Sequence, residues 1–318
     1  MSLSLWIAVF PDTGTAAPIP WTLEEKVNSD GPGRMVIITH QDRPIVRLVF
    51  GEGQMKPFLH VYGEEGELLT NPGLDPTGKT TGQFPHHRGL FIGWKIQSDL
   101  GAWDLWHMNR GGDIRVVEIE KKEALDSGVH LLTRNEWRAG KEDDAGSSLL
   151  LTEWRDMRIS KPARGRTQID LNFRLLPARD LQLAGDLQHS GVHFRAANEV
   201  AGRAKETSYL QEPDGLVKGH DLKWCELLFP IGERWYTALQ MNGADNPVEE
   251  LSMRNYGRFG YFFKRDLKKD QALDLQYRFI IAAVDPPDHP PQRSPERQAR
   301  DRKAAQASYE EFLASLRH

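Results

Sequence analysis

The sequence concentrates ionisable side chains in one short segment, Gln83-Phe84-Pro85-His86-His87-Arg88-Gly89. Histidine changes its charge near neutral pH, so His86 and His87 are candidate catalytic residues acting as general acid or base. Arg88 keeps its charge and presents a planar fork that fits a carboxylate, a phosphate or vicinal oxygens, so we assign it to substrate binding. The alternative is structural: one histidine hydrogen-bonds a backbone carbonyl and Arg88 pairs with a nearby acid.

A second polar and aromatic group follows in Trp103-Asp104-Leu105-Trp106-His107. The face of an indole ring stacks on the apolar C–H face of a sugar and also attracts cations. We therefore assign Trp106 and His107 to substrate binding. The alternative is that the tryptophans belong to the hydrophobic core.

A third group lies in Gln188-His189-Ser190-Gly191-Val192-His193-Phe194-Arg195. Alternate residues of an extended strand share one face, so His189, His193 and Arg195 are predicted to point to the same side. We assign His189 to catalysis, and His193 and Arg195 to substrate binding. Histidines at this spacing also suit a metal, although zinc needs a third protein ligand.

Two carboxylates and a further arginine complete the candidates. Glu153 and Glu226 are placed on or beside strands, where either could partner a histidine, and Glu153 is the candidate catalytic carboxylate. The alternative for each is an exposed strand residue in a surface ion pair. Arg254 stands at a turn, and we assign it to substrate binding. Cys225 is interpreted as buried packing rather than as a nucleophile.

Strands must position these residues, because apolar and polar residues alternate through most of the chain. A half-buried strand requires this period of two. The clearest cases are 168–175 and 273–279. Further predicted strands are 35–38, 45–50, 58–62, 90–96, 114–119, 129–137, 149–157, 192–196, 224–229, 236–241 and 257–263. So many short strands without helical periods between them predict an all-β fold, a large antiparallel β-sandwich.

One helix is predicted, over 294–317 at the C-terminal end. Ser294 is a suitable N-cap and Pro295 occupies the first helical position. Its apolar residues form one stripe that is expected to pack on the sandwich: Ala305, Tyr309, Phe312 and Leu316.

Length, charge and the first residues limit the remaining possibilities. The 318 residues carry a formal charge of -4, which provides no net basic field for nucleic acid. No segment has the roughly 20 apolar residues that a membrane helix needs. Residues 1–20 are interpreted as a signal remnant or an edge segment, and 21–318 as one domain. The first interpretation favours a periplasmic or secreted protein, the second leaves a cytoplasmic one open, and the sequence does not define an oligomeric state.

The sequence from Val36 to Ala283 resembles a bacterial family catalogued as methane oxygenase PmoA-like, whose function is undefined. The resemblance rests on these segments: Lys56-Pro57-Phe58, Pro85-His86-His87-Arg88-Gly89-Leu90, Gly93-Trp94, Trp106, the strand Gly191 to Arg195, Trp224-Cys225, Asn246-Pro247 and Arg254-Asn255-Tyr256-Gly257. It implies a galactose-mutarotase-like sandwich and a part in carbohydrate catabolism. The methane oxygenase name does not transfer, because that enzyme subunit spans the membrane several times and this chain has no span.

Three hypotheses for function follow. The first is a carbohydrate-active enzyme of lyase, hydrolase or epimerase type that acts on a sugar or oxidised sugar through the histidine and arginine cleft. The second is a non-catalytic carbohydrate-binding protein. The third is a metal-assisted hydrolase with His86, His107, His189 and His193 as ligands. No cofactor is predicted, and a divalent metal is the one that the third hypothesis would need.

Overall fold

The computed structural model describes residues 21–74, 77, 79–108, 111–140, 148–287 and 292–317. The first of three sheets has eight strands. Their order is β1 (Trp21–Val27), β2 (Arg34–His40), β3 (Arg43–Phe50), β4 (Phe58–Val61), β5 (Leu90–Gly93), β13 (Gly191–Arg195), β18 (Arg258–Phe262) and β17 (Glu250–Arg254).

The second sheet also has eight strands and contains the longest ones. Their order is β14 (Ser208–Glu212), β15 (Trp224–Ile231), β16 (Arg234–Asn242), β20 (Leu273–Val284), β11 (Arg166–Pro177), β10 (Leu149–Ala163), β9 (Gly128–Arg138) and β8 (Asp113–Leu125). A small third sheet has the order β19 (Arg265–Leu267), β12 (Leu181–Ala184), β6 (Lys95–Ser98) and β7 (Gly101–Asp104). The pairs of neighbouring strands are antiparallel, as in the β10–β11 and β13–β5 pairs.

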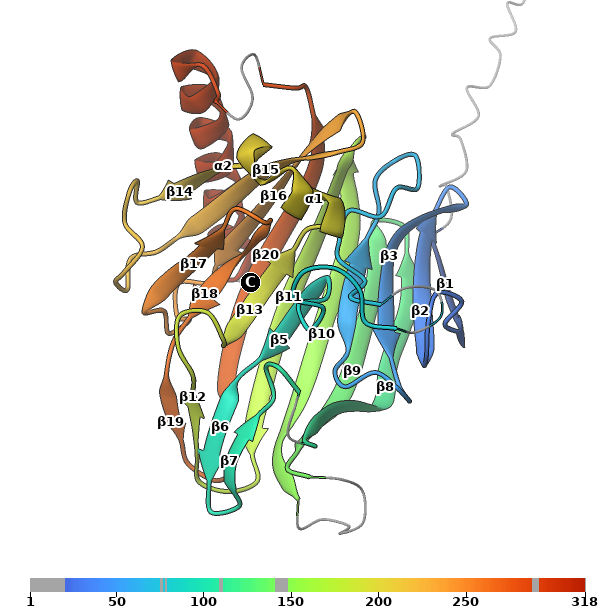
Figure 1. Cartoon of the computed structure of the whole chain (residues 1–318), viewed down its shortest axis with the longest axis vertical. Helices are drawn as coiled ribbons and strands as arrows, with labels where there is room; N and C mark the ends of the chain where they lie inside the picture. The colour runs from blue at the N-terminus through green and yellow to red at the C-terminus, as the bar shows by residue number, and fades with distance from the viewer. Residues whose placement is uncertain are drawn as a thin grey trace, which may run out of the picture.

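The two large sheets pack face to face, which confirms the predicted antiparallel β-sandwich. In Figure 1, β5 and β13 lie in front of the long strands β10 and β11. Alternation produces the core between the sheets: Ile169, Leu171 and Phe173 of β11 are buried, and the residues between them are half-buried. Val192 and Phe194 of β13 enter the same cluster from the first sheet.

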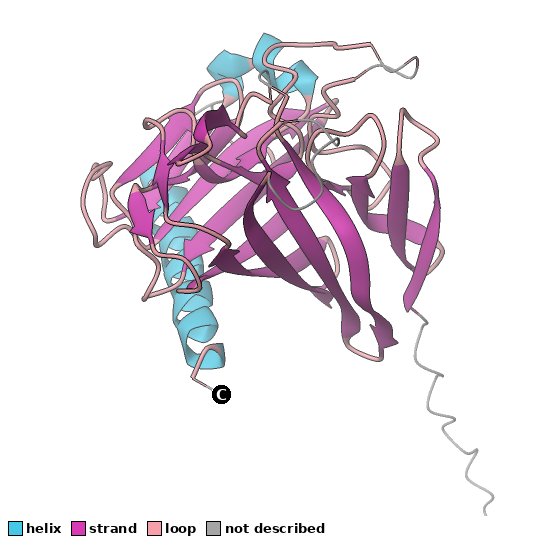
Figure 2. Cartoon of the chain, turned by 90° about the horizontal axis from the view of Figure 1, so that it is seen from below, coloured by secondary structure: helices cyan, strands magenta, loops and turns pink. Residues whose placement is uncertain are grey.

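The C-terminal helix α2 (Pro295–Ser315) packs on the outer side of the second sheet, as predicted, and Figure 2 shows it beside the strands. The Ser294 hydroxyl accepts a hydrogen bond from the backbone N–H of Arg297, which confirms the N-cap. Its buried stripe joins a cluster on that sheet. The cluster contains Ala305, Tyr309 and Phe312 with Leu210, Trp224, Leu239, Met241 and Ile280, and Leu316 packs against it.

The prediction of one strand over 90–96 was wrong. The chain leaves the first sheet after β5, and β6 then pairs with β7 and β12 in the third sheet. Trp94 lies at this change of sheet, where its indole N–H donates to the carbonyl of Phe263. Several short or weakly alternating elements were also not predicted from the sequence. These are β1, β7, β12, β14, β17, β19, helix α1 (Asn198–Gly202) and the 3-10 turn Ala204–Glu206.

The interpretation of residues 1–20 as a signal remnant or edge segment falls outside the described residues. The expectation of a periplasmic or secreted protein therefore stays a prediction. None of the helices in the described ranges has the length and apolar character needed to cross a lipid bilayer.

Candidate functional site

The three predicted segments meet on the face of the first sheet that points away from the inter-sheet core. Because Val192 and Phe194 of β13 face that core, His193 of the same strand faces outward, opposite Phe91 of β5. Phe91 forms a small outer cluster with Val49, Phe58 and Trp106. The loop before β5 and the loop after β7 cover this face and bring their histidines onto it.

The histidine rings of these segments form a continuous series. The ring centroids of His86 and His87 lie 4.1 Å apart, those of His86 and His107 4.7 Å, and those of His107 and His189 4.6 Å. His193 joins through Trp106, at 4.8 Å between ring centroids. Residues separated by more than 100 positions thus lie together, as the histidine and arginine cleft of the first hypothesis requires.

Two of these histidines are held by an aspartate three residues earlier. Nδ1 of His107 lies 2.8 Å from Oδ2 of Asp104, and Nδ1 of His189 lies 2.8 Å from Oδ2 of Asp186. Such a bond fixes the ring and leaves Nε2 for another partner. Neither aspartate was predicted from the sequence, although a repeated Asp-Leu-X-His pattern marks them at 104–107 and 186–189.

Both loops contain a residue in a strained backbone conformation. Phe84 has φ of 55° and Met108 has φ of 64°, in the left-handed region that side chains other than glycine rarely adopt. Strain of this kind persists where the surrounding structure enforces it, and it is frequent at functional sites. The two strained residues, Phe84 and Met108, are close in sequence to His86 and His107 respectively.

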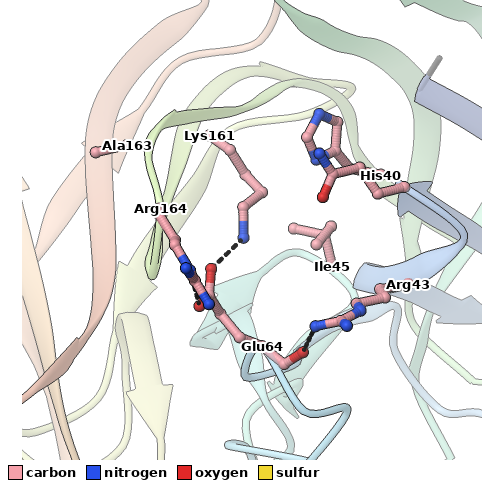
Figure 3. A pocket seen from close by; sticks show the side chains of 8 residues that line it. His40, Arg43, Ile45, Glu64, Lys161, Ala163 and Arg164 are labelled. Atoms are coloured by element: carbon pink, nitrogen blue, oxygen red, sulfur yellow. Dashed lines mark hydrogen bonds and ion pairs between the residues drawn. The ribbon is translucent and has the colours of Figure 1, made fainter. Parts of the chain in front are cut away.

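A cavity of about 350 Å³ opens between the two loops. Among the residues that the structure describes, its lining includes two basic groups and two histidines but no acidic side chain: Met55, Lys56, Thr80, Pro85, His86, Arg88, His107 and Met108. Another pocket, of about 440 Å³, lies between the β2–β3 and β10–β11 hairpins and is also basic. There, however, the Glu64 carboxylate lies 3.3 Å from the Lys161 amine and 3.6 Å from the Arg164 guanidinium (Figure 3).

Lys56 is the residue of the cavity that sequence reasoning did not select. It is 4% exposed, its amine donates to the Trp106 carbonyl oxygen at 2.6 Å, and it lies 4.4 Å from the centroid of the Phe91 ring. Burial, with a smaller contribution from Arg88, lowers the pKa of Lys56 to about 7. No acidic side chain of the described chain forms an ion pair with it.

Arg88 borders the same cavity with part of its guanidinium unused. Nε donates to the Pro85 carbonyl at 3.1 Å and Nη1 donates to Oε1 of Gln54 at 2.6 Å. Within the described residues, no carboxylate pairs with Arg88 and Nη2 has no hydrogen-bond partner. The arginine is therefore oriented by neutral groups and keeps a donor and its charge for a ligand.

The neighbouring histidines are held neutral. Burial, followed by the charge of Lys56, lowers the pKa of His86 to about 3. His87 is 3% exposed, burial and then Arg258 lower its pKa, and neither ring nitrogen has a hydrogen-bond partner in the described residues. A neutral imidazole retains one N–H, so this buried ring has an unsatisfied donor.

The assignment of Trp106 to sugar stacking was wrong. Its side chain is 0% exposed and packs between His87, Phe91 and His193, so no ligand can reach its face. The accessible aromatic surface belongs instead to Phe84, which is 41% exposed, and to the half-buried Tyr256, with ring centroids 5.0 Å apart.

His193 and Arg195 are also enclosed, which corrects their assignment to substrate binding. His193 uses both ring nitrogens: Nε2 donates to the Ser190 carbonyl at 2.8 Å and Nδ1 accepts from Arg258 at 3.0 Å. Arg195 is 0% exposed, and it donates to the backbone carbonyls of Ala196, Gln83 and Tyr256. His189 precedes β13, so the two histidines do not share a strand face as predicted.

Glu153 lies away from the histidines, inside the sandwich. It is 0% exposed, and it accepts from the Asn135 amide at 2.9 Å, the Trp137 indole at 2.6 Å and the Arg155 guanidinium at 2.7 Å. Both carboxylate oxygens are thus occupied, which indicates a structural role rather than the proposed catalytic one.

The remaining candidates also lie outside the cavity. Glu226 pairs with Arg293 at 2.6 Å, and Cys225 is fully buried, as expected for packing. Arg254, at the end of β17, donates to the Met253 carbonyl and does not line the cavity. Its assignment to substrate binding therefore gains no support from this cavity.

No group of three or more histidine, cysteine, aspartate or glutamate side chains in the described ranges could hold a metal ion. The third hypothesis had named four histidine ligands. One of them, His193, has no free nitrogen.

Comparison with known proteins gives a family without an assigned function. No curated protein matches the chain. A solved structure titled as a polysaccharide lyase is similar with a TM-score of 0.34 and 11% sequence identity, over 85% of this chain. This chain spans only 33% of the length of that one. A family model described as "Family of unknown function (DUF6807)" matches residues 35–289, and the chain belongs to that family.

Proposed function

We propose that the protein is an enzyme that acts on an acidic sugar by moving the proton beside its carboxyl group, as a lyase or an epimerase does. The observation that carries the proposal is the composition of the cavity. Arg88 and Lys56 line it, and within the described residues no acidic side chain lines it or pairs with either of them. A cationic Arg88 without an acidic partner favours an anionic ligand, and its fixed charge stabilises the charge that develops on the carboxyl group of that ligand.

His107 is the best-placed general base. Its Nδ1 is held by Asp104, so the lone pair of Nε2 is available to accept a proton. His107 lines the cavity beside His86. Arg88 would bind the carboxyl group while His107 accepts the proton from the adjacent carbon.

Glycoside hydrolysis is a weaker alternative. Most glycoside hydrolases use two carboxyl groups that flank the scissile bond. The described part of this cavity's lining contains none, and Asp104 is engaged with His107. Proton transfer beside a carboxyl group needs the groups that line the cavity: a cation and a neutral base.

The test is to incubate the protein with uronic-acid sugars and with neutral sugars of the same stereochemistry in D2O. Exchange of the proton beside the carboxyl group, or the ultraviolet absorbance of an unsaturated product, is expected with the acidic sugars only. His107→Gln should abolish either signal. His40→Gln, which alters the other pocket, is the matched control and should not.

Two results would reject the proposal. Equal affinity for neutral and acidic sugars would remove the role of the basic groups. Binding of acidic sugars without exchange or product would identify a carbohydrate-binding protein, for which Phe84 and Tyr256 offer exposed aromatic surface.

A further inference from the structure

We infer that Lys56 is a covalent catalytic residue that forms an imine with the aldehyde or ketone group of a substrate that also carries a carboxyl group. The inference rests on the proposed function for the acidic group of the substrate and adds to it a carbonyl group and a covalent step. It begins from the unusual position of the amine.

The surroundings of Lys56 suit an amine better than an ammonium ion. An ammonium has three donors, and in the described residues this nitrogen has one hydrogen-bond acceptor, the Trp106 carbonyl. Its other close neighbours are the faces of the Phe91 and Trp106 rings, with centroids 4.4 Å and 5.4 Å away, which attract a cation but offer no strong hydrogen-bond acceptor for its remaining N–H groups. A neutral amine bonded once to Trp106 keeps a lone pair, and the lone pair is the nucleophile.

The charge of Arg88 also favours the neutral amine of Lys56. The groups that interact with Lys56 are Arg88, Asp104, His86, His87 and His193. Arg88 disfavours a second positive charge, whereas Asp104 favours it but is engaged with His107. Burial beside a fixed cation is one of the recognised ways to activate a lysine for attack on a carbonyl.

The cavity provides the remaining parts. Lys56, His86 and Arg88 line the same space of about 350 Å³. The carboxyl group of the substrate would bind Arg88, which presents its carbonyl carbon to the amine. A 2-oxo acid or an open-chain uronic acid has both groups.

The covalent step is balanced without an oxidant. The nitrogen lone pair forms a C–N bond to the carbonyl carbon while the C=O π pair moves to oxygen, which takes a proton. The nitrogen then loses its second proton, the hydroxyl group leaves as water, and a C=N bond remains. The neutral His86 ring is placed to relay these protons. Hydrolysis reverses the sequence.

The experiment is reductive trapping of the whole protein. Pyruvate and, separately, D-glucuronate are mixed with the protein, sodium borohydride is added, and the adduct is located by peptide mass spectrometry. One reduced adduct is expected, on the peptide that contains Lys56. Mapping on the unmodified chain does not depend on how a variant folds.

Variants sharpen the result. Lys56→Met keeps most of the side-chain volume, and we expect it to lose the adduct. Lys161→Met is the matched control, because the Lys161 amine pairs with Glu64 in the other pocket (Figure 3), and it should leave the adduct unchanged. Adducts spread over exposed lysines, or none at all, would overturn the inference.

The outcome is separable from that of the proposed function. If acidic sugars undergo proton exchange but no adduct forms on Lys56, the proposed function stands and the covalent role is wrong. If pyruvate is trapped on Lys56 but no acidic sugar reacts, the covalent role stands and the proposed function is wrong.

Discussion

The imidazole rings of His107 and His189 lie 4.6 Å apart, and each is hydrogen-bonded through Nδ1 to an aspartate three residues earlier. The two Asp-Leu-X-His segments come from different loops, 82 residues apart in numbering (189 − 107). Only His107 lines the cavity, so the two pairs are expected to differ in their effect on catalysis.

Asp104→Asn should reduce turnover while the protein stays folded. Asparagine retains an oxygen that can accept hydrogen bonds from the backbone N–H groups of Trp106 and His107, as the Asp104 carboxylate does now. The asparagine amide would donate to Nδ1 of His107, so the proton of the imidazole ring would move to Nε2. His107 would then have no lone pair on Nε2 with which to accept a proton in the cavity. We expect a fall in kcat of about 100-fold, the lower range for loss of a general base.

Steady-state kinetics and the melting temperature check this prediction together. Asp180→Asn, which removes the partner of an exposed Lys268 pair, is the control and should leave kcat unchanged. An Asp104→Asn protein with full activity would exclude His107 as the base.

Arg88→Lys should weaken the binding of acidic sugars by about tenfold, because lysine keeps the charge but loses the planar fork. The bonds from Arg88 to Pro85 and Gln54 would also be lost, so its orientation would no longer be fixed. Arg254→Lys is the matched substitution outside the cavity, and the affinity of this variant for acidic sugars should equal that of the unmodified protein within experimental error. Isothermal titration calorimetry of both variants measures these affinities, and equal losses of affinity in the two variants would contradict the prediction.

Local sequence patterns predicted much of the sandwich. Strands such as 168–175 alternate cleanly, because one face of β11 is buried and the other is half-buried. The role of Glu153 does not follow from this period: it lies on a strand, as predicted, but β10 buries Glu153 together with Arg155 and leaves Trp154 between them half-buried. An ion pair inside a sandwich cannot be distinguished from a surface pair by residue type alone.

Only part of the site could be predicted from the sequence, for a related reason. Histidines beside turns were visible as a pattern, but their convergence was not. Antiparallel pairing puts the segments before β5 and before β13 at opposite ends of this strand pair, and His107, on the loop after β7, lies between His86 and His189. Lys56 was not visible, because its burial depends on Trp106, 50 residues later in the chain. Trp106 was misassigned for the same reason: the loop that carries it folds back over the sheet.

Replacement by alanine should lower the stability of the protein at Trp106 and weaken sugar binding at Phe84. Trp106 is 0% exposed, so Trp106→Ala should lower the free energy of unfolding by about 3–5 kcal/mol, as large core truncations do. Phe84 is 41% exposed, so Phe84→Ala should change it by less than about 1 kcal/mol and instead weaken sugar binding. Urea denaturation and titration with sugar measure the two effects. Loss of sugar affinity without destabilisation in Trp106→Ala would restore the stacking role.

The buried histidines should make the protein lose stability in mild acid. His60, His87 and His193 are 5%, 3% and 0% exposed, and burial is the main cause that lowers the pKa of each. For His60 the pKa falls from 6.5 to about 3. As the pH falls below about 6.5, the unfolded chain takes up protons that the folded chain does not, so the folded state is disfavoured.

The stabilising contribution is therefore complete above pH 6.5 and is lost progressively toward the lower pKa of the folded state. Each such histidine adds about 1.4 kcal/mol per pH unit to the slope. Urea unfolding between about pH 6.5 and 5 measures the net slope, to which Glu226 contributes with the opposite sign because burial raises its pKa to about 7. His60→Gln removes one titrating ring, since glutamine can still bond the Thr70 hydroxyl that now lies 2.9 Å from Nδ1. The slope should fall by about one proton in this variant, and an unchanged slope would show that His60 is protonated in the folded protein.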